Sequence, residues 1–502
     1  MVKKISKLLI ANRGEVAARI AYSAKKMEMK VVMVYSEEDR DLPYLLSGDQ
    51  LVSLGDGTLQ DTYLDRDKIL GIARRLGVNA IHPGYGFLAE DAAFVRAVEE
   101  EAIFVGPTAD CMQLLGDKVQ AKSLARSLGI PVIPQFEVPG DFPVIIKATL
   151  GGGGVGQRVV FNQAEWEQAR AQVQSEGERA VGCGKLFVEK YLPKVRHLEV
   201  QIIGDVYGNY LHLFERECSL QRRRQKMVEE APSPYLSTRP ELRTKLVQAA
   251  LALAQASRYR GVGTVEFLVD EFDNYYFMEV NPRLQVEHAV TEMILDIDLV
   301  EWQLRIAAGE PLPWSEGDIE RRRRGHALEV RLYAEDPRNN FMPSVGTLEY
   351  LRLRGAVAGR ADVRVESAYV SGNQIGISYD PMIAKIITKG ENREQARHNL
   401  VRILDDSLCR GVTTNIDYLQ AILAHPAFIR ADLFTNFIEC YHQELVVMGD
   451  SGNEFEDAAT LAAAIAAGFF LNDSSRDSRY SREYSDKRGD KRGDELSGFR
   501  NV

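Results

Sequence analysis

One stretch of the chain, residues 278–288, alternates apolar and polar side chains without a break. Successive side chains of an extended strand point to opposite faces, so the pattern predicts a β-strand with one apolar and one polar face. The apolar face, which begins with Met278 and Val280, is suited to a protein core. The polar face carries Glu279, Asn281, Arg283, Gln285 and Glu287.

The order of groups on this polar face indicates a binding site. Glu279 and Asn281 offer the hard oxygen ligands that Mg²⁺ prefers. Arg283 can hold an oxyanion through two hydrogen bonds, and Glu287 can take a proton. Because Pro282 cannot donate to a sheet ladder, we expect the strand to end near Asn281 and a loop to follow. A surface strand of an antiparallel sheet also alternates, and the pattern alone leaves that alternative open.

Length and composition predict a soluble protein of several domains. The 502 residues exceed what one hydrophobic core usually holds. The net charge of −10 gives no general attraction to nucleic acid or to an anionic membrane. Five cysteines without C-x-x-C spacing argue against a disulfide framework or a structural zinc site. Without an apolar leader or a long apolar run, we expect a cytoplasmic protein with no membrane insertion.

The first part of the chain has the pattern of a doubly wound α/β sheet. A buried strand at 7–11, a helix from Val16 and a strand at 30–35 form a β-α-β unit. The glycine-rich loop at 82–87 follows a further strand, at a position where such sheets bind ligands. A G-x-G-x-x-G motif is missing from the first turn, which argues against a bound dinucleotide.

A second glycine-rich loop, at 150–156, follows a strand that ends on Lys147 and precedes a strand at 158–161. It is not a Walker A site, because neither a helix nor Gly-Lys-Ser follows. Its backbone N–H groups could approach phosphate, and its glycines would let it move as a lid. A plain flexible hairpin is the alternative.

A predicted strand at 262–269 carries Glu266, and a turn connects this strand to the alternating stretch. Glu266 and Glu279 should therefore face each other across a hairpin as a Mg²⁺ pair, with Asn281 beside them. Of two basic runs, the one that ends at Lys226 could hold phosphates, whereas Arg321–Arg324 is typical of a solvated loop. Further strands are expected at 186–192, 196–203 and 210–217, and a long helix at 239–257.

The last third predicts a separate α+β unit. A helix at 295–308 and a charged linker at 309–325 precede it. It should hold strands at 326–333, 346–353, 363–366 and 380–387, and helices at 391–406 and 415–424. An alanine-rich helix at 455–471 and a polar, disordered tail from residue 472 should follow.

Taken together, several motifs resemble biotin carboxylase, the ATP-grasp component of biotin-dependent carboxylases such as acetyl-CoA, acyl-CoA and pyruvate carboxylase. The resemblance extends from about residue 5 to about residue 445. It rests on Ala-Asn-Arg-Gly-Glu at 11–15, His-Pro-Gly-Tyr-Gly-Phe-Leu at 82–88, Leu-Gly-Asp-Lys at 115–118, Val-Ile-Ile-Lys at 144–147, Glu-Lys-Tyr-Leu at 189–192, Gln-Arg-Arg at 221–223, Lys-Met-Val-Glu-Glu-Ala-Pro at 226–232 and Asn-Pro-Arg-Leu-Gln-Val-Glu-His at 281–288.

The resemblance implies a fold of mixed α/β and α+β class. A doubly wound N-terminal domain would cover 1–115, and an ATP-grasp domain with a mobile glycine-rich lid subdomain (about 133–203) would cover 116–325. An α+β biotin carboxylase C-terminal domain (326–445), a helical extension (446–471) and a disordered tail (472–502) would follow. The implied activity is that of an ATP-dependent ligase that forms a C–N bond, carboxylating biotin with bicarbonate through carboxyphosphate.

The resemblance also implies residue roles. ATP binding falls to Lys118, Lys147, Gly152, Gly153, Gly154, Glu189, Lys190, Leu192, His197, Gln221 and Leu268. Mg²⁺, with Mn²⁺ as an alternative ion, falls to Glu266, Glu279 and Asn281. Bicarbonate falls to Lys226, Arg283, Gln285 and Val286, and biotin to Tyr85 and Arg364. The catalytic residues would be Glu287 as general base with Arg283, Lys226 and Arg364.

The sequence departs from the family pattern near the lid. Arg224 stands where the family has His, and Leu150 and Val155 interrupt the glycines. The segment between Pro134 and Pro143 is short and lacks a lid helix. Two alternatives to an ordinary biotin carboxylase therefore stay open: another ATP-grasp ligase for a different carboxylate, and a weakly active regulatory paralogue.

The expected partners are separate chains. The sequence has no Ala-Met-Lys-Met biotinylation motif, so we expect a separate biotin carboxyl carrier protein, whose biotin is the substrate, and a separate carboxyltransferase. The resemblance also implies a homodimer.

Overall fold

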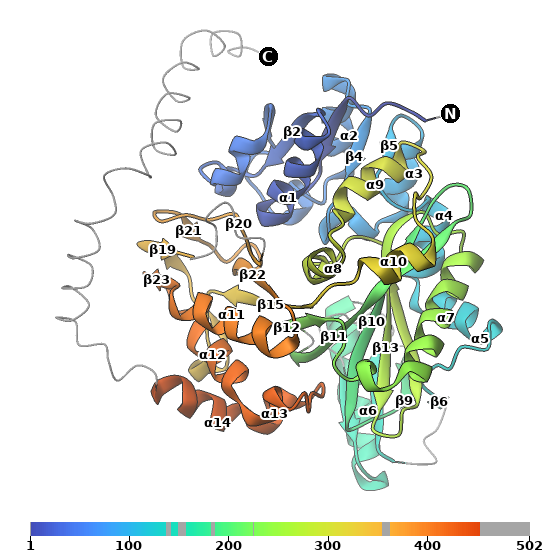
Figure 1. Cartoon of the computed structure of the whole chain (residues 1–502), viewed down its shortest axis with the longest axis vertical. Helices are drawn as coiled ribbons and strands as arrows, with labels where there is room; N and C mark the ends of the chain where they lie inside the picture. The colour runs from blue at the N-terminus through green and yellow to red at the C-terminus, as the bar shows by residue number, and fades with distance from the viewer. Residues whose placement is uncertain are drawn as a thin grey trace, which may run out of the picture. The chain divides into compact units, whose positions relative to one another are not determined.

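The computed structural model describes residues 2–136, 142–148, 157–181, 186–223, 225–353 and 362–451. The chain up to Val446 forms one compact unit (Figure 1). Several predictions lie outside the described residues: the glycine loop with Leu150, Gly152, Gly153, Gly154 and Val155, the substituted Arg224, the helix at 455–471 and the tail from 472. Within the described residues, no helix is long and apolar enough to cross a membrane.

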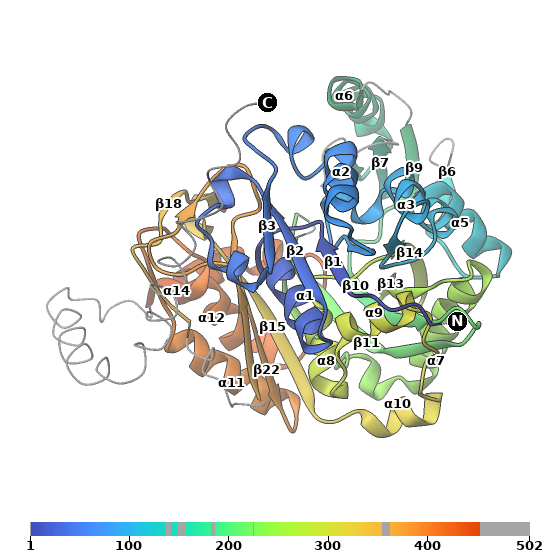
Figure 2. The ribbon, with the colours of Figure 1, turned by 90° about the horizontal axis from the view of Figure 1, so that it is seen from above.

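The N-terminal residues form a five-stranded parallel sheet in the order β3-β2-β1-β4-β5, which confirms the predicted doubly wound pattern. Figure 2 shows its first three strands beside α1. The strands are β1 (Lys7–Ile10), β2 (Lys30–Tyr35), β3 (Gln50–Ser53), β4 (Ala80–His82) and β5 (Ile103–Phe104), and the helices are α1 (Gly14–Lys26), α2 (Arg66–Leu76), α3 (Ala92–Glu99) and α4 (Ala109–Gly116).

An eight-stranded sheet forms the centre of the compact unit, and all of its neighbouring strands pair antiparallel. Its order is β14-β13-β10-β11-β12-β15-β22-β20. The strands are β10 (Val195–Gly204), β11 (Tyr210–Arg222), β12 (Gln225–Ala231), β13 (Gly261–Asp270), β14 (Tyr275–Asn281), β15 (His326–Tyr333), β20 (Val363–Ser367) and β22 (Met382–Gly390).

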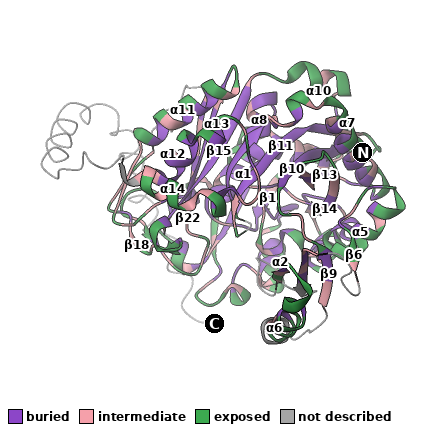
Figure 3. Ribbon diagram, turned by 90° about the horizontal axis from the view of Figure 1, so that it is seen from below, coloured by how far each residue is buried: buried purple, intermediate pink, exposed green. Residues whose placement is uncertain are grey.

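Burial on this sheet shows which face carries the site. All residues of β10 are buried (Figure 3). Leu198, Val200 and Ile202 share one hydrophobic cluster with the helix α7 (Pro240–Ala256). The alternating positions point to the other face and are polar, namely His197, Glu199 and Gln201. Buried polar groups need partners, so this second face must be filled by a charge network or by ligands.

A small sheet of four strands, in the order β6-β9-β7-β8, lies within the predicted lid subdomain. Its strands are β6 (Gln135–Phe136), β7 (Val144–Ala148), β8 (Gln157–Val160) and β9 (Leu186–Lys190). The helix α6 (Gln163–Val181) packs Trp166 and Val173 against Val144 and Val160. The sequence analysis did not predict this helix.

The remaining elements connect these sheets. The helices are α5 (Lys118–Ser127), α8 (His288–Leu295), α9 (Leu299–Ala307), α10 (Glu316–Arg322), α11 (Arg393–Asp405), α12 (Ile416–Ala424), α13 (Pro426–Ile429) and α14 (Phe437–Ser451). The short strands are β16 (Glu335–Asp336), β17 (Met342–Pro343), β18 (Gly346–Thr347), β19 (Tyr350–Arg352), β21 (Gln374–Ile375) and β23 (Leu408–Arg410).

Two predictions in this region need local correction. The helix expected at 295–308 is present as α9 but begins later, at Leu299, because Asp296 adopts a left-handed conformation after α8 and the Asp298 side chain caps α9. The expected linker at 309–325 contains α10, which begins with a capping box between Ser315 and Asp318. Arg321 therefore lies in a helix and not in a loop, although it is exposed.

Two strand predictions also need correction. The strand expected at 210–217 continues to Arg222, because it pairs with β12 up to the Arg222–Gln225 position. The strand expected at 346–353 is two short strands, β18 and β19, which pair with different partners.

Candidate functional site

The alternating stretch forms the expected strand and loop: β14 ends at Asn281, directly before Pro282. Glu279 on β14 and Glu266 on β13 are direct cross-strand neighbours, which confirms the predicted hairpin pairing. The Asn281 side-chain nitrogen donates to Glu266 Oε1 at 2.9 Å. Lys118, at the start of α5, lies 2.8 Å from Glu279 Oε2. Two carboxylates and an amide thus gather at one end of the hairpin, and this donor set fits a hard divalent cation.

A buried lysine lies beside this donor set. Lys226 Nζ on β12 lies 2.6 Å from Glu199, 3.1 Å from Glu266 and 2.5 Å from Glu287. Burial alone would lower the pKa of Lys226, but the three carboxylates outweigh it and raise the pKa well above its ordinary value. We call these four residues the Lys226 cluster.

Glu287, the predicted general base, is held by two cations. It accepts from Lys226 at 2.5 Å and from Arg331 on β15 at 2.9 Å. Burial would raise its pKa, but Lys226, Arg331 and Arg216 outweigh burial and keep the pKa well below its ordinary value. Glu287 also directly precedes α8, whose N-terminal dipole favours a negative charge. The carboxylate is therefore ionised, as a general base must be before it can accept a proton.

Arg216 on β11 is a central residue that the sequence analysis missed. Its side chain is fully buried and pairs with Glu199. It also donates to Gln285 at 2.8 Å and to Thr264 at 3.0 Å, and further to Gln201 and Thr291. Arg216 thereby orients Gln285, one of the predicted bicarbonate residues. Arg216 lies among polar residues of β11, and this pattern could have suggested a functional role for it. Its partners could not be read from the pattern, because they come from four other segments.

Arg283 lies at the rim of the site. Its Nε donates to Glu90 Oε1 at 2.5 Å, and its Nη2 donates to Asn281 Oδ1 at 3.1 Å. Gln285 donates in turn to Glu266 Oε1 at 2.9 Å. The side chains of Asn281, Arg283 and Gln285 therefore connect the divalent-cation donors to the loop that follows them.

Some of the predicted ATP residues join this site. His197 lies 3.0 Å from Glu266 Oε2 and opposite Leu268 in the sheet, and Gln221 is opposite Lys226. Glu189 belongs to the four-stranded sheet, where it is buried and pairs with Lys122.

Three further predicted ATP residues, Lys147, Lys190 and Leu192, lie in or beside this small sheet. Lys190 is the last residue of β9, and Leu192 follows it. Lys147 lies in β7, opposite Phe187 of β9.

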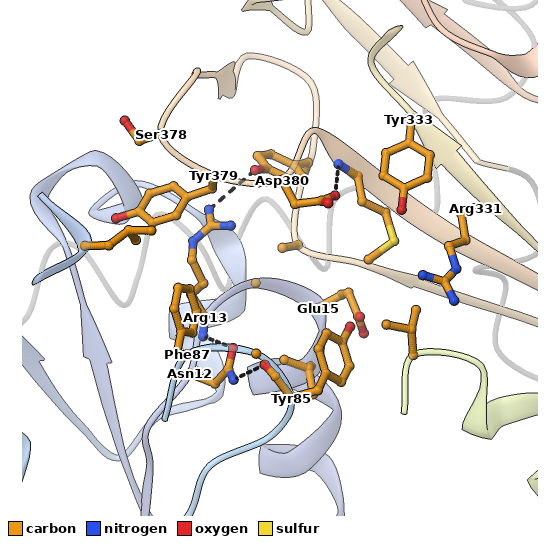
Figure 4. A pocket seen from close by; sticks show the side chains of 18 of the residues that line it. Asn12, Arg13, Glu15, Tyr85, Phe87, Arg331, Tyr333, Ser378, Tyr379 and Asp380 are labelled. Carbon is orange, nitrogen blue, oxygen red and sulfur yellow. Dashed lines mark hydrogen bonds between the residues drawn. The ribbon is translucent and has the colours of Figure 1, made fainter. Parts of the chain in front are cut away.

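Figure 4 shows a cavity of about 510 Å³, and one of its lining residues, Arg331, pairs with Glu287 of the Lys226 cluster. It is lined from the carboxyl ends of the parallel sheet by Glu15 and Tyr85, and from the other side by Arg331 and Tyr333. Arg283 and Val286 line it as well, so the cavity and the Lys226 cluster share the loop after β14. Within the described residues, the buried hydroxyl of Tyr85 has no hydrogen-bond partner.

The loop that carries Tyr85 is held from β1. The Asn12 side chain donates to Pro83 O at 2.6 Å and to Tyr85 O at 2.8 Å. Gly84 has φ +66°, and a Cβ at this position would lie 2.7 Å from Asn12 Nδ2. Glycine is therefore required here for both the backbone conformation and the close packing.

Arg364 is not among the residues that line the cavity. It pairs with Glu292 at 2.5 Å and with Glu366. Burial would lower the pKa of Arg364, but these two carboxylates raise it. Among the described residues, no hydrogen bond joins Tyr85 and Arg364, the two residues that are predicted to bind biotin.

Comparison with known proteins gives three successive family matches. Residues 4–112 match "Biotin carboxylase, N-terminal domain", and residues 117–315 match "Carbamoyl-phosphate synthase L chain, ATP binding domain". Residues 329–440 match "Biotin carboxylase C-terminal domain".

Curated relatives agree with these matches. Biotin carboxylase 2 of Bacillus subtilis is 41% identical over 448 residues, which cover 86% of this chain and 99% of that protein. The mitochondrial methylcrotonoyl-CoA carboxylase subunit alpha of Mus musculus is 42% identical over 456 residues, which cover 88% of this chain and 63% of that protein. The chain thus spans less than two thirds of this longer relative.

Solved structures share the fold. The biotin carboxylase complex with β-γ-ATP from Campylobacter jejuni has a TM-score of 0.82 and 38% identity, covering 87% of this chain and 99% of that chain. The biotin carboxylase domain dimer of the Hydrogenobacter thermophilus 2-oxoglutarate carboxylase, in complex with MgADP, ADP and bicarbonate, has the same TM-score and identity, covering 88% and 98%.

Proposed function

The chain belongs to the biotin carboxylase family of ATP-dependent ligases, and on that premise we propose that it carboxylates biotin with bicarbonate at the expense of ATP. The observation that carries the proposal is the Lys226 cluster. It brings together a cationic group that can bind an anion, the ionised carboxylate of Glu287 and the cation donor Glu266, and Arg331, which pairs with Glu287, lines the cavity.

We propose that Lys226, Arg283, Gln285 and the backbone of Val286 hold bicarbonate. Glu287 accepts the proton of bicarbonate, whose oxygen then attacks the γ-phosphorus of ATP, so that ADP leaves and carboxyphosphate forms. For this, Glu287 exchanges its contact with Lys226 for one with the substrate. Glu266, Glu279 and Asn281 would hold Mg²⁺, which neutralises phosphate charge when it is bound.

Carboxyphosphate then releases CO₂ and phosphate. Biotin N1 gives its proton to the released phosphate and forms the new C–N bond to CO₂, with Tyr85 and Arg364 at the biotin end. Arginine side chains stabilise the negative charge that develops on the ureido oxygen. Excluding water protects carboxyphosphate, which hydrolyses readily, and this is the role we propose for the glycine lid.

ATP is proposed to bind between the central sheet and the four-stranded sheet. Lys118, Lys147 and His197 would contact its phosphates or ribose, and Glu189 and Leu192 its adenine. The remaining contacts would come from Lys190, Gln221, Leu268 and the glycines at 152–154. The supporting observation is the Lys118–Glu279 ion pair, which joins a predicted phosphate contact to a predicted cation ligand.

The proposed partners are a separate biotin carboxyl carrier protein and a carboxyltransferase, with a homodimer as the assembled state. Proteins called biotin carboxylase are matched over almost their whole length, for example over 97% of the Halalkalibacterium halodurans protein. The domain boundaries after residues 115, 325 and 445 and a cytoplasmic location are also proposals, which limited proteolysis and cell fractionation test.

The test of the proposed function is ADP formation by the purified chain. We expect it to require bicarbonate and Mg²⁺ and to be stimulated by free biotin. ADP formation that is independent of bicarbonate but requires another carboxylate would instead identify a different ATP-grasp ligase. Nucleotide binding without turnover would identify a regulatory paralogue.

A further inference from the structure

A second buried lysine, Lys385 on β22, lies outside the residues assigned above. Its side chain is 0% exposed. Its Nζ donates to the backbone carbonyl of Val286 at 2.7 Å and pairs with Glu366 Oε2 at 2.7 Å. It also lies 3.6 Å from Glu15 Oε2. One ammonium group thus reaches three segments that are far apart in the sequence.

The contact with Val286 fixes the loop that follows β14. Val286 lies between Gln285 and Glu287, so a displaced Val286 carbonyl would move both of these side chains. Its neighbour His288 holds the same loop locally, through Nδ1 to Gln285 O at 2.7 Å. Lys385 adds a long-range contact to this loop, because it reaches the Val286 carbonyl from β22.

The contact with Glu366 reaches the biotin end. Glu366 Oε2 forms the ion pair with Lys385, and Glu366 Oε1 accepts a hydrogen bond from Arg364 Nε at 2.9 Å. Glu292 holds the opposite side of Arg364 and also pairs with Arg19 at 2.9 Å. The orientation of Arg364 therefore depends on a carboxylate that Lys385 holds.

The third contact reaches α1 and the cavity. Glu15 lines the cavity beside Tyr85, as Figure 4 shows. Within the described residues, neither of its carboxylate oxygens has a hydrogen-bond partner, so Lys385 is its nearest cation. Burial would lower the pKa of Lys385, but Glu15, Glu366 and Glu329 outweigh it and raise the pKa, which keeps the ammonium charged.

We propose that Lys385 is a positioning residue that holds the bicarbonate loop and Arg364 in a fixed relation, so that CO₂ forms next to biotin. The inference rests on the proposed function. It assigns Lys385 no contact with a substrate: it acts through the Val286 carbonyl and through Glu366.

The test compares Lys385→Met with Lys389→Met in the full chain. Lys389 is the matched control, because it lies on the same strand and its Nζ donates to the Met293 carbonyl at 2.7 Å. We expect Lys385→Met to raise KM for bicarbonate and for free biotin about tenfold or more, and KM for ATP less than about twofold. Lys389→Met should change none of them by more than about twofold.

A second variant separates the effect of Lys385 on Arg364 from its effect on the loop at Val286. Glu366→Gln loosens Arg364 while it leaves the Lys385–Val286 contact in place, so KM for biotin should rise more than KM for bicarbonate. Hydrogen exchange of a peptide that covers 282–288 gives a readout that does not need activity. It should become faster in Lys385→Met but not in Lys389→Met.

Unchanged exchange in 282–288 would overturn the inference, even if Lys385→Met is less stable. Faster exchange with unchanged KM values would overturn it as well, because Lys385 would then be merely structural. A wild-type protein whose ADP formation ignores bicarbonate would overturn the proposed function, and the inference with it. This outcome is recognised in the wild type alone, before any variant is compared.

Discussion

The central sheet carries two buried lysines that differ in what they hold. Among the described residues, the Lys226 ammonium pairs with three carboxylates, those of Glu199, Glu266 and Glu287, of which Glu266 is a predicted cation ligand and Glu287 the predicted base. Lys385 also contacts carboxylates, but it donates to a backbone carbonyl as well. A lysine held by side chains alone can exchange partners when substrate arrives, whereas one that anchors backbone keeps a loop in place.

Buried charge therefore serves two purposes in one sheet. Breaking a buried ion pair by removing one partner costs about 3–5 kcal/mol, because the other charge is left without a partner. This cost applies to the ion pairs of Lys226 and to those of Lys385, so stability alone cannot distinguish the two lysines. Their responses to ligands and their effects on individual KM values can.

The largest effect is expected for Lys226→Met. It removes the cation from three carboxylates, and we expect bicarbonate-dependent ADP formation to fall by about 10²–10³-fold. Because Lys226 lowers the pKa of Glu287, that pKa should rise in the variant and the acid limb of the rate profile should move to higher pH. Steady-state rates across pH measure this, and an unmoved acid limb would contradict the assignment of Glu287 as base.

The variant also sharpens the comparison through metal binding. A divalent cation can take over part of the lost positive charge beside Glu266, so Mg²⁺ should raise the melting temperature of Lys226→Met more than that of Lys385→Met. Equal stabilisation of the two variants would show that the two clusters do not differ in this way.

A smaller but still severe effect is expected for Glu287→Gln. The amide keeps the shape of the side chain and loses its basicity, so ADP formation should fall by about 10²-fold. Nucleotide binding, measured by calorimetry, should stay within about twofold, because Glu287 is predicted to act on bicarbonate. Glu100→Gln, an exposed position, serves as the control. Residual activity near the wild-type level would rule out Glu287 as the base.

Arg216→Met should affect the Lys226 side through positioning. The change removes the donors that hold Gln285, Thr264 and Glu199 and should destabilise the protein by about 3–5 kcal/mol. In the protein that still folds, KM for bicarbonate should rise more than KM for ATP. Urea unfolding and steady-state kinetics measure the two effects. A loss of stability with unchanged KM for bicarbonate would restrict Arg216 to a structural role.

The smallest effect is expected for Glu15→Gln on the Lys385 side. Burial raises the pKa of Glu15 to about 7 from its ordinary value of 4.5. Between these pH values the folded state keeps a proton that the unfolded chain has released, so wild-type stability falls as pH rises through the window. Glutamine does not titrate, so the variant should lose less stability between pH 5 and pH 8. Urea unfolding at these two pH values tests this, and an identical loss in both proteins would contradict it.

Local patterns predicted the parts of the site that lie close together in the sequence. The alternating stretch and Pro282 correctly gave a strand that ends at Asn281, and the short turn before it gave the Glu266–Glu279 pair. Family resemblance added residues such as Tyr85, for which no local pattern was decisive. The roles themselves stay predictions.

Long-range partners could not be predicted from these patterns. Arg216 and Lys385 pair with residues whose proximity depends on the order of strands in the sheet, and periodicity does not contain that order. The helix α6 was missed because its pattern is largely polar, and α10 was missed because it is short and lies in a segment whose charges had suggested a linker.

The pairing of β12 with β15 sets a limit on dissecting the molecule. It joins Val228 to Val330 and Ala231 to Ala327 across the proposed boundary after residue 325. A chain cut there would leave β12 as a bare edge, with backbone donors and acceptors open to pairing with another copy. We expect the separated halves to aggregate, and a transplanted C-terminal half to need a foreign strand in the place of β12. Chimaeras between relatives should therefore exchange both strands together.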